Sequence, residues 1–116
     1  MPNVTALTQL LNKGQDSALL RFGLASAYLK EQPEDHLAQA LRHLKRCLEL
    51  EPKYTAAYKQ LAQVQQACED FTSAAETLRL GIESAESAGD LQAQRAMQVF
   101  LKRLQKHLGT NLPPNP

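Results

Sequence analysis

The chain has 116 residues, of which 43% are hydrophobic and 22% charged, and its formal net charge is +1. This length suits a single domain that buries a core without disulfides or a metal, and the near-neutral charge does not favour a nucleic-acid-binding protein. Ala, Leu and Gln are abundant, whereas β-branched residues are few and scattered. The composition therefore favours helices over a sheet and predicts an all-α fold.

Nothing in the sequence predicts export or membrane insertion. No apolar run reaches membrane-spanning length, and the N-terminus lacks the pattern of a signal peptide. We therefore expect a cytoplasmic protein with no membrane partner. In that compartment Cys47 and Cys68 are expected to be free thiols.

Polar breaks that contain Gly, Pro or acidic residues divide the chain into stretches of helical length. Apolar residues recur within these stretches at three- and four-residue spacing, which is typical of helices packed on one face. About six helices are predicted, joined by short connections that favour antiparallel neighbours, at residues 4–13, 17–30, 35–50, 54–67, 70–85 and 91–108. The Pro-rich residues 111–116 are predicted to be a disordered tail.

Capping residues support these boundaries. Gly14 suits the end of the first predicted helix, because glycine readily adopts the left-handed conformation found there. Asp16 or Ser17 suits the start of the second helix, and Asp70 suits the start of the fifth. The pairs Glu34-Asp35 and Glu69-Asp70 fall at predicted helix starts, where acids favour the helix dipole and need no acid–base role.

The sequence also contains an internal repeat. A first set of residues reappears 34 positions later: Ala40, Leu44 and Cys47 correspond to Ala74, Leu78 and Gly81. A second set reappears 37 positions later: Leu24, Ala25 and Tyr28 correspond to Leu61, Ala62 and Gln65. An insertion in the turn at residues 31–35 of the first unit explains the difference, because loops tolerate insertions at low cost.

This pattern of small and large positions resembles the tetratricopeptide repeat (TPR) family, whose unit of 34 residues is a pair of helices. Three residues depart from the family pattern: Arg21 replaces a large aromatic residue, Gln65 replaces Tyr, and Glu86 replaces the closing Pro. The resemblance implies a short α-solenoid of antiparallel helix pairs, like small stand-alone bacterial proteins of this kind. It implies one domain over residues 1–110, with repeat units at 18–54 and 55–88 and capping helices at 4–13 and 91–108.

The resemblance further implies that partners bind in a concave groove lined by the first helix of each pair. The predicted helix at residues 17–30 contributes a mostly apolar stripe: Leu19, Phe22, Ser26 and Leu29. The predicted helix at residues 54–67 contributes a more polar stripe: Ala56, Lys59, Gln63 and Gln66. Phe22 and Ser26 stand where a clamp for a terminal carboxylate needs Lys and Asn, so a helix or an extended peptide with an apolar anchor fits better. Alternatively, the helix at residues 4–13 folds over the apolar stripe and closes it.

The sequence gives no reason to expect an enzyme, a cofactor or a metal. The five glycines are isolated, so there is no Gly-rich phosphate loop. His43 and Cys47 are four residues apart on one predicted helix, but two ligands do not make a structural zinc site. Cys47 also falls on the inward small-residue position, where a buried thiol is expected.

The function predicted from the sequence is therefore a protein–protein interaction module, an adaptor or scaffold that docks another protein or peptide. One alternative is a self-associating homodimer that uses the same apolar stripe. Another is binding of nucleic acid or an anionic ligand by the last helix, through Arg95, Lys102, Arg103 and Lys106. Aromatic side chains that could stack on bases are not interleaved with these cations, which disfavours nucleic acid.

Overall fold

The computed structural model describes residues 3–109, which form six α-helices and confirm the predicted all-α class. The helices are α1 (Val4–Asn12), α2 (Ala18–Glu31), α3 (His36–Leu50), α4 (Thr55–Ala67), α5 (Phe71–Ala88) and α6 (Leu91–Leu108). None of the helices within residues 3–109 is both long and apolar enough to cross a membrane. The predicted disordered tail lies outside the described residues.

Short polar side chains begin several of these helices. The backbone N–H of Leu20 donates to Ser17 Oγ at the start of α2, and that of Ser73 donates to Asp70 Oδ1 at the start of α5. Each bond satisfies an N–H that has no partner inside its helix. The predicted end of α5 near residue 85 is too early, because the helix runs to Ala88 and ends where Gly89 adopts φ 70°.

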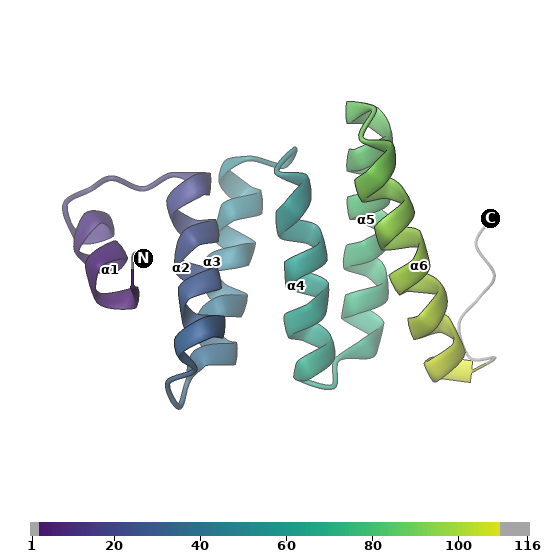
Figure 1. Cartoon of the computed structure of the whole chain (residues 1–116), viewed down its shortest axis with the longest axis horizontal. Coiled ribbons are helices and arrows are strands. Elements are labelled where there is room, and N and C mark those ends of the chain that lie inside the picture. The colour runs from purple at the N-terminus through teal and green to yellow at the C-terminus, as the bar shows by residue number, and fades with distance from the viewer. Residues whose placement is uncertain (1–2, 110–116) are drawn as a thin grey trace.

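The helices stand in a row of antiparallel pairs. Figure 1 shows α2, α4 and α6 in front, with the paler α3 and α5 behind them. α2 packs on α3, α4 packs on both α3 and α5, and α6 packs on α5 with a smaller contact to α4. α1 lies at one end of the row against α2, and α6 closes the other end (Figure 1).

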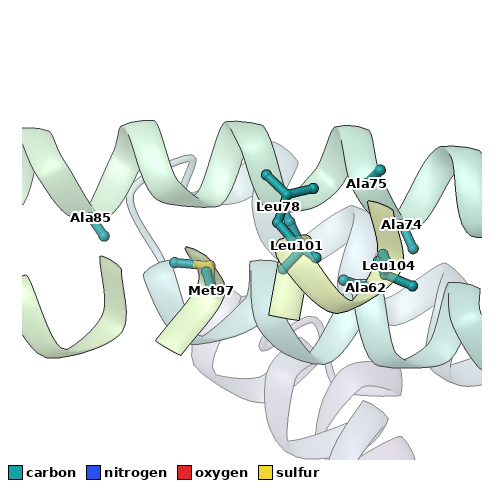
Figure 2. Packing of buried hydrophobic residues seen from close by; sticks show 8 residues of the cluster. All are labelled: Ala62, Ala74, Ala75, Leu78, Ala85, Met97, Leu101 and Leu104. Atoms are coloured by element: carbon teal, nitrogen blue, oxygen red, sulfur yellow. The ribbon is translucent and has the colours of Figure 1, made fainter. Parts of the chain in front are cut away.

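The buried residues form two clusters that share α4. One cluster joins α2, α3 and α4 through Ala25, Ala40, Leu44, Cys47, Ala57, Leu61 and Val64. The other joins α4, α5 and α6 through Ala62, Ala74, Ala75, Leu78, Ala85, Met97, Leu101 and Leu104 (Figure 2). The alanines of the repeat pattern are fully buried, so small residues allow the paired helices to approach: Ala25, Ala40, Ala62 and Ala74.

The last helix matches the first helices of the pairs in register but not in chemistry. Ala57 and Leu61 of α4 correspond to Ala93 and Met97 of α6, 36 positions later, and both pairs pack in the clusters. The same shift takes Ala62, which is fully buried, to Gln98, which is exposed. The side of α6 on which a further helix could pack is therefore polar at this position.

Candidate functional site

The register of α6 extends the predicted groove to a third helix. The shift of 36 positions that superposes α6 on α4 takes Lys59 to Arg95, Gln63 to Val99 and Gln66 to Lys102. We call the surface made by the predicted groove residues of α2 and α4 together with these three residues of α6 the front face, because α2, α4 and α6 are the helices drawn in front in Figure 1. The repeat pattern in the sequence predicted α6 only as a capping helix.

The α2 part of the front face is divided between solvent and core. Leu19 is 70% exposed, whereas Phe22 and Leu29 are half-buried against the α2–α4 cluster. The ring of Phe22 packs on that of Tyr54 with centroids 5.1 Å apart. Leu19 is thus a free apolar side chain, while Phe22 also holds the turn before α4 against α2.

A hydrogen bond connects the α2 and α4 parts. Gln60 Nε2 donates to Ser26 Oγ at 3.2 Å, so Ser26 is partly engaged within the protein. Lys59, Gln63 and Gln66 are exposed and form no side-chain hydrogen bond or ion pair within residues 3–109. Their polar groups are therefore available to a ligand.

Two hollows flank this surface. Between α1 and α2 lies an apolar hollow of about 490 Å³, lined by Leu7, Leu10, Gln15, Ser17, Leu19, Leu20, Gly23, Ser26, Ala27 and Lys30. Between α4 and α6 lies a more polar hollow of about 340 Å³, lined by Thr55, Ala56, Lys59, Asp90, Gln92, Ala93, Ala96 and Met97. Leu19 is 70% exposed, so α1 does not close the apolar stripe at this residue.

Sequence reasoning missed a partly buried polar network between α2 and α3. Arg21 donates to both carboxylate oxygens of Asp16, from Nε at 2.8 Å and Nη2 at 3.1 Å, and its Nη1 donates to Nδ1 of His43 at 3.0 Å. The ring of Tyr28 stacks on His43 with centroids 5.7 Å apart. The only signal in the sequence was the unusual Arg21 at an aromatic position.

Burial, assisted by neighbouring positive charges, keeps His43 neutral. Burial lowers the pKa of His43 to about 4, and the positive charges of Arg42 and Arg21 act in the same direction. The pKa of Asp16 is lowered chiefly by its hydrogen bond to Arg21. His43 is therefore a neutral acceptor that ties α3 to α2, a structural role away from the front face.

The equivalent position in the second repeat is filled differently. Gln65 and Thr77 correspond to Tyr28 and His43, and both are buried. Thr77 Oγ1 donates to Gln65 Oε1 at 2.7 Å, linking α5 to α4. The departure of Gln65 from the repeat pattern is thus compensated by its neighbour.

The described residues offer little for chemistry. Cys47 is buried, as predicted, and Cys68 is exposed. Burial raises the pKa of the Cys47 thiol to about 11. Cys47 is therefore not a thiolate nucleophile near neutral pH. Within residues 3–109 no cluster of three or more His, Cys, Asp or Glu side chains could hold a metal ion.

Comparison with known proteins identifies the family of the chain. The family model described as Tetratricopeptide repeat matches residues 34–98. A TPR repeat-containing protein of Pseudomonas aeruginosa is 40% identical over 103 residues, which are 89% of this chain and 95% of the relative. The chain belongs to the tetratricopeptide repeat family. Proteins with TPR folds generally mediate protein–protein interactions and are generally non-catalytic.

Solved structures share most of the arrangement of helices. A Bordetella parapertussis protein solved in solution is 31% identical, with a TM-score of 0.77 over 97% of this chain and 99% of that one. A crystallised TPR domain protein of Salinibacter ruber has a TM-score of 0.71 at 23% identity, over 78% of this chain and 98% of that one. The TPR2B domain of yeast Sti1, in complex with pHsp70, has a TM-score of 0.79 at 20% identity, over 90% of this chain and 81% of that one.

Proposed function

We propose that this TPR protein is an adaptor that docks a peptide or a helix of another protein on its front face, without chemistry. The observation that carries the proposal is the accessible surface of three adjacent helices. Leu19 offers an exposed apolar anchor, and Lys59, Gln63 and Gln66 offer polar groups without partners among residues 3–109.

The construction of this face suits binding without rearrangement. Its residues lie on helices held by two buried clusters, so little order has to be gained when a ligand binds. The apolar hollow beside Leu19 can take a side chain such as Leu or Phe, and pockets of this kind supply most of the binding energy at interfaces. The complex of the yeast Sti1 domain with pHsp70 supports a binding role for this fold.

The experiment that tests the proposal is selection of ligands from a displayed library of random peptides by the immobilised native protein. The selected peptides are then measured against Leu19→Lys and against a matched control, Leu80→Lys. Both leucines are exposed, but Leu80 lies on α5, outside the front face. We expect Leu19→Lys to weaken binding at least about tenfold, the loss of a desolvated anchor, and Leu80→Lys to leave it unchanged.

Other outcomes contradict the proposal in distinct ways. If both variants lose peptide binding equally, or neither loses it, the binding site lies outside the front face. A native mass of two chains in light scattering that Leu19→Lys reduces to one, with no peptide selected, would replace the adaptor with a homodimer that uses the same surface. Phe22→Lys is less informative, because the half-buried Phe22 also stabilises the fold.

A further inference from the structure

The positive charges of α6 are not neutralised within the protein, in contrast to several on earlier helices. Arg21 and Arg46 pair with Asp16, and Arg79 pairs with Glu76. The four cations of α6 form no ion pair with any residue of the described part of the chain: Arg95, Lys102, Arg103 and Lys106. No acidic residue follows Asp90 in the sequence, so the helix carries a charge of +4 in a chain whose total is +1.

These cations are arranged along one side of the helix around an apolar centre. Arg95, Val99, Lys102 and Lys106 are spaced by four, three and four residues, which places them on one stripe. At 1.5 Å per residue the stripe is about 16 Å long. Val99 is 50% exposed. Beside it lies a hollow of about 810 Å³, lined by Val99, Lys102, Arg103, Gln105, Lys106 and Gly109.

The helix dipole does not account for this pattern. Lys106 lies in the last turn of α6, where a cation is favourable. Arg95 lies near the positive N-terminal end, where a cation gains nothing from the dipole. Like charges four residues apart, such as those of Lys102 and Lys106, repel one another. An oppositely charged ligand would remove that repulsion.

We propose that α6 binds an acidic segment of the partner, whose carboxylates face these cations and whose single apolar side chain packs on Val99. This inference rests on the proposed function and adds the chemical class of the partner. The front face then changes along its length from apolar at Leu19 to cationic at α6. A matching ligand is apolar at one end and acidic at the other.

The surroundings of the stripe favour a peptide over nucleic acid. The aromatic rings of α6 already have partners within the protein: Phe100 packs against the buried α4–α6 cluster, and the ring of His107 packs on that of Phe71 with centroids 4.4 Å apart. Val99 and the neighbouring Gln98 and Gln105 suit the apolar and polar groups of a peptide. The face also continues onto Lys59 and Gln63 of α4, which a longer peptide reaches.

The test uses a dye-labelled probe of about a dozen residues, enough to follow the stripe as a helix. It is made of glutamates with one central leucine, and its C-terminus is amidated so that no terminal carboxylate takes part. Fluorescence anisotropy compares the native chain with Lys102→Glu/Arg103→Glu and Val99→Ser. The control Lys45→Glu/Lys53→Glu changes the net charge equally at exposed sites on and after α3.

We expect the α6 charge reversal to weaken binding at least about tenfold, since two attractive pairs become repulsive. Val99→Ser should weaken it about threefold, and the control should bind like the native chain. Equal loss in both charge variants would show non-specific attraction and overturn the proposal. A thymidine oligonucleotide that binds more tightly than the peptide, with no effect of Val99→Ser, would assign the stripe to nucleic acid instead.

The two proposals fail separately. Library peptides that depend on Leu19, together with an acidic probe that does not bind, would leave the adaptor standing and remove the acidic partner. A probe that binds α6 as expected, while no selected peptide depends on Leu19, would confine the binding site to α6 and overturn the front face as proposed.

Discussion

The two repeats bury equivalent positions with different chemistry. In the first, the ring of Tyr28 stacks on that of His43 at an interplanar angle of 20°. In the second, Thr77 donates a hydrogen bond to Gln65. In both repeats, therefore, two side chains contact each other between the paired helices, by ring stacking in one and by a hydrogen bond in the other. Neither position is restricted to one residue type.

A second pair of equivalent positions differs in size. Tyr58 of α4 stands where α2 has Arg21, and Gly81 of α5 stands where α3 has Cys47. A Cβ atom at Gly81 would lie 2.6 Å from Tyr58 Cβ and 2.6 Å from Met97 Sδ. The aromatic residue is accommodated because its neighbour has no side chain. The following predictions test this comparison, from the largest expected effect to the smallest.

Gly81→Ala is expected to destabilise the protein by about 3 kcal/mol, because overpacking forces Tyr58 and Met97 to move. Urea unfolding followed by circular dichroism measures the change. The matched substitution Cys47→Ala in the first repeat removes a small buried group and should cost less, about 1 kcal/mol. A Gly81→Ala protein as stable as the native one would show that the second crossing is looser than these distances imply.

His43 should make the stability depend on pH, whereas its counterpart Thr77 cannot titrate. The lowered pKa of about 4 means that the unfolded chain, with an ordinary value of 6.5, binds the proton more readily. The contribution of neutral His43 is therefore fully present above pH 6.5 and is lost as the pH falls toward 4. We expect the free energy of unfolding to drop by about 2 kcal/mol over this range.

The control for this pH dependence is His43→Gln, which should flatten the profile between pH 6.5 and 4 while Arg21, Arg42 and Asp16 stay in place. His36 and His107 remain in that variant. A profile that keeps its slope without His43 would assign the pH dependence to other groups.

Thr77→Val should cost about 1.5 kcal/mol, because it leaves the buried amide oxygen of Gln65 without its donor. The double variant Gln65→Leu/Thr77→Val removes both partners and should recover most of the loss. Thermal unfolding of the two single variants and the double variant gives the coupling energy. Additive losses would mean that the hydrogen bond contributes nothing of its own.

Gly23→Ala should have the smallest effect and the opposite sign, a gain of about 0.5 kcal/mol from helix propensity. A Cβ atom there would meet Leu7 Cδ1 at 3.7 Å, an ordinary van der Waals contact. Urea unfolding measures this change in the free energy of unfolding, for comparison with that of Gly81→Ala. A loss instead of a gain would show that α1 packs on α2 more tightly than this contact suggests.

Sequence reasoning was strongest where the signal was local. The helices, the caps at Ser17 and Asp70 and the small residues at Ala25 and Ala62 follow from spacing along the chain, and the structure contains each of them. The end of α5 was misplaced because the last buried residue of the helix, Ala85, comes a turn before Gly89 stops the helix.

What depends on tertiary position was not predictable. Arg21 and His43 are 22 residues apart and meet only because α2 and α3 pair. Arg95, Val99 and Lys102 join the front face only because α6 repeats the register of α4, and its departures from the repeat pattern concealed that register. The predicted docking residues of α2 and α4 remain a prediction, since fold alone does not show a ligand.

The exposed Gln98 has a consequence for how long such an array can become. Where Ala62 lets a neighbouring backbone approach, Gln98 presents an amide that would lose its water if another helix packed there. A further helix that packed on this side of α6 would therefore have to supply a hydrogen-bond partner for that amide, whereas a small residue at the position would need none.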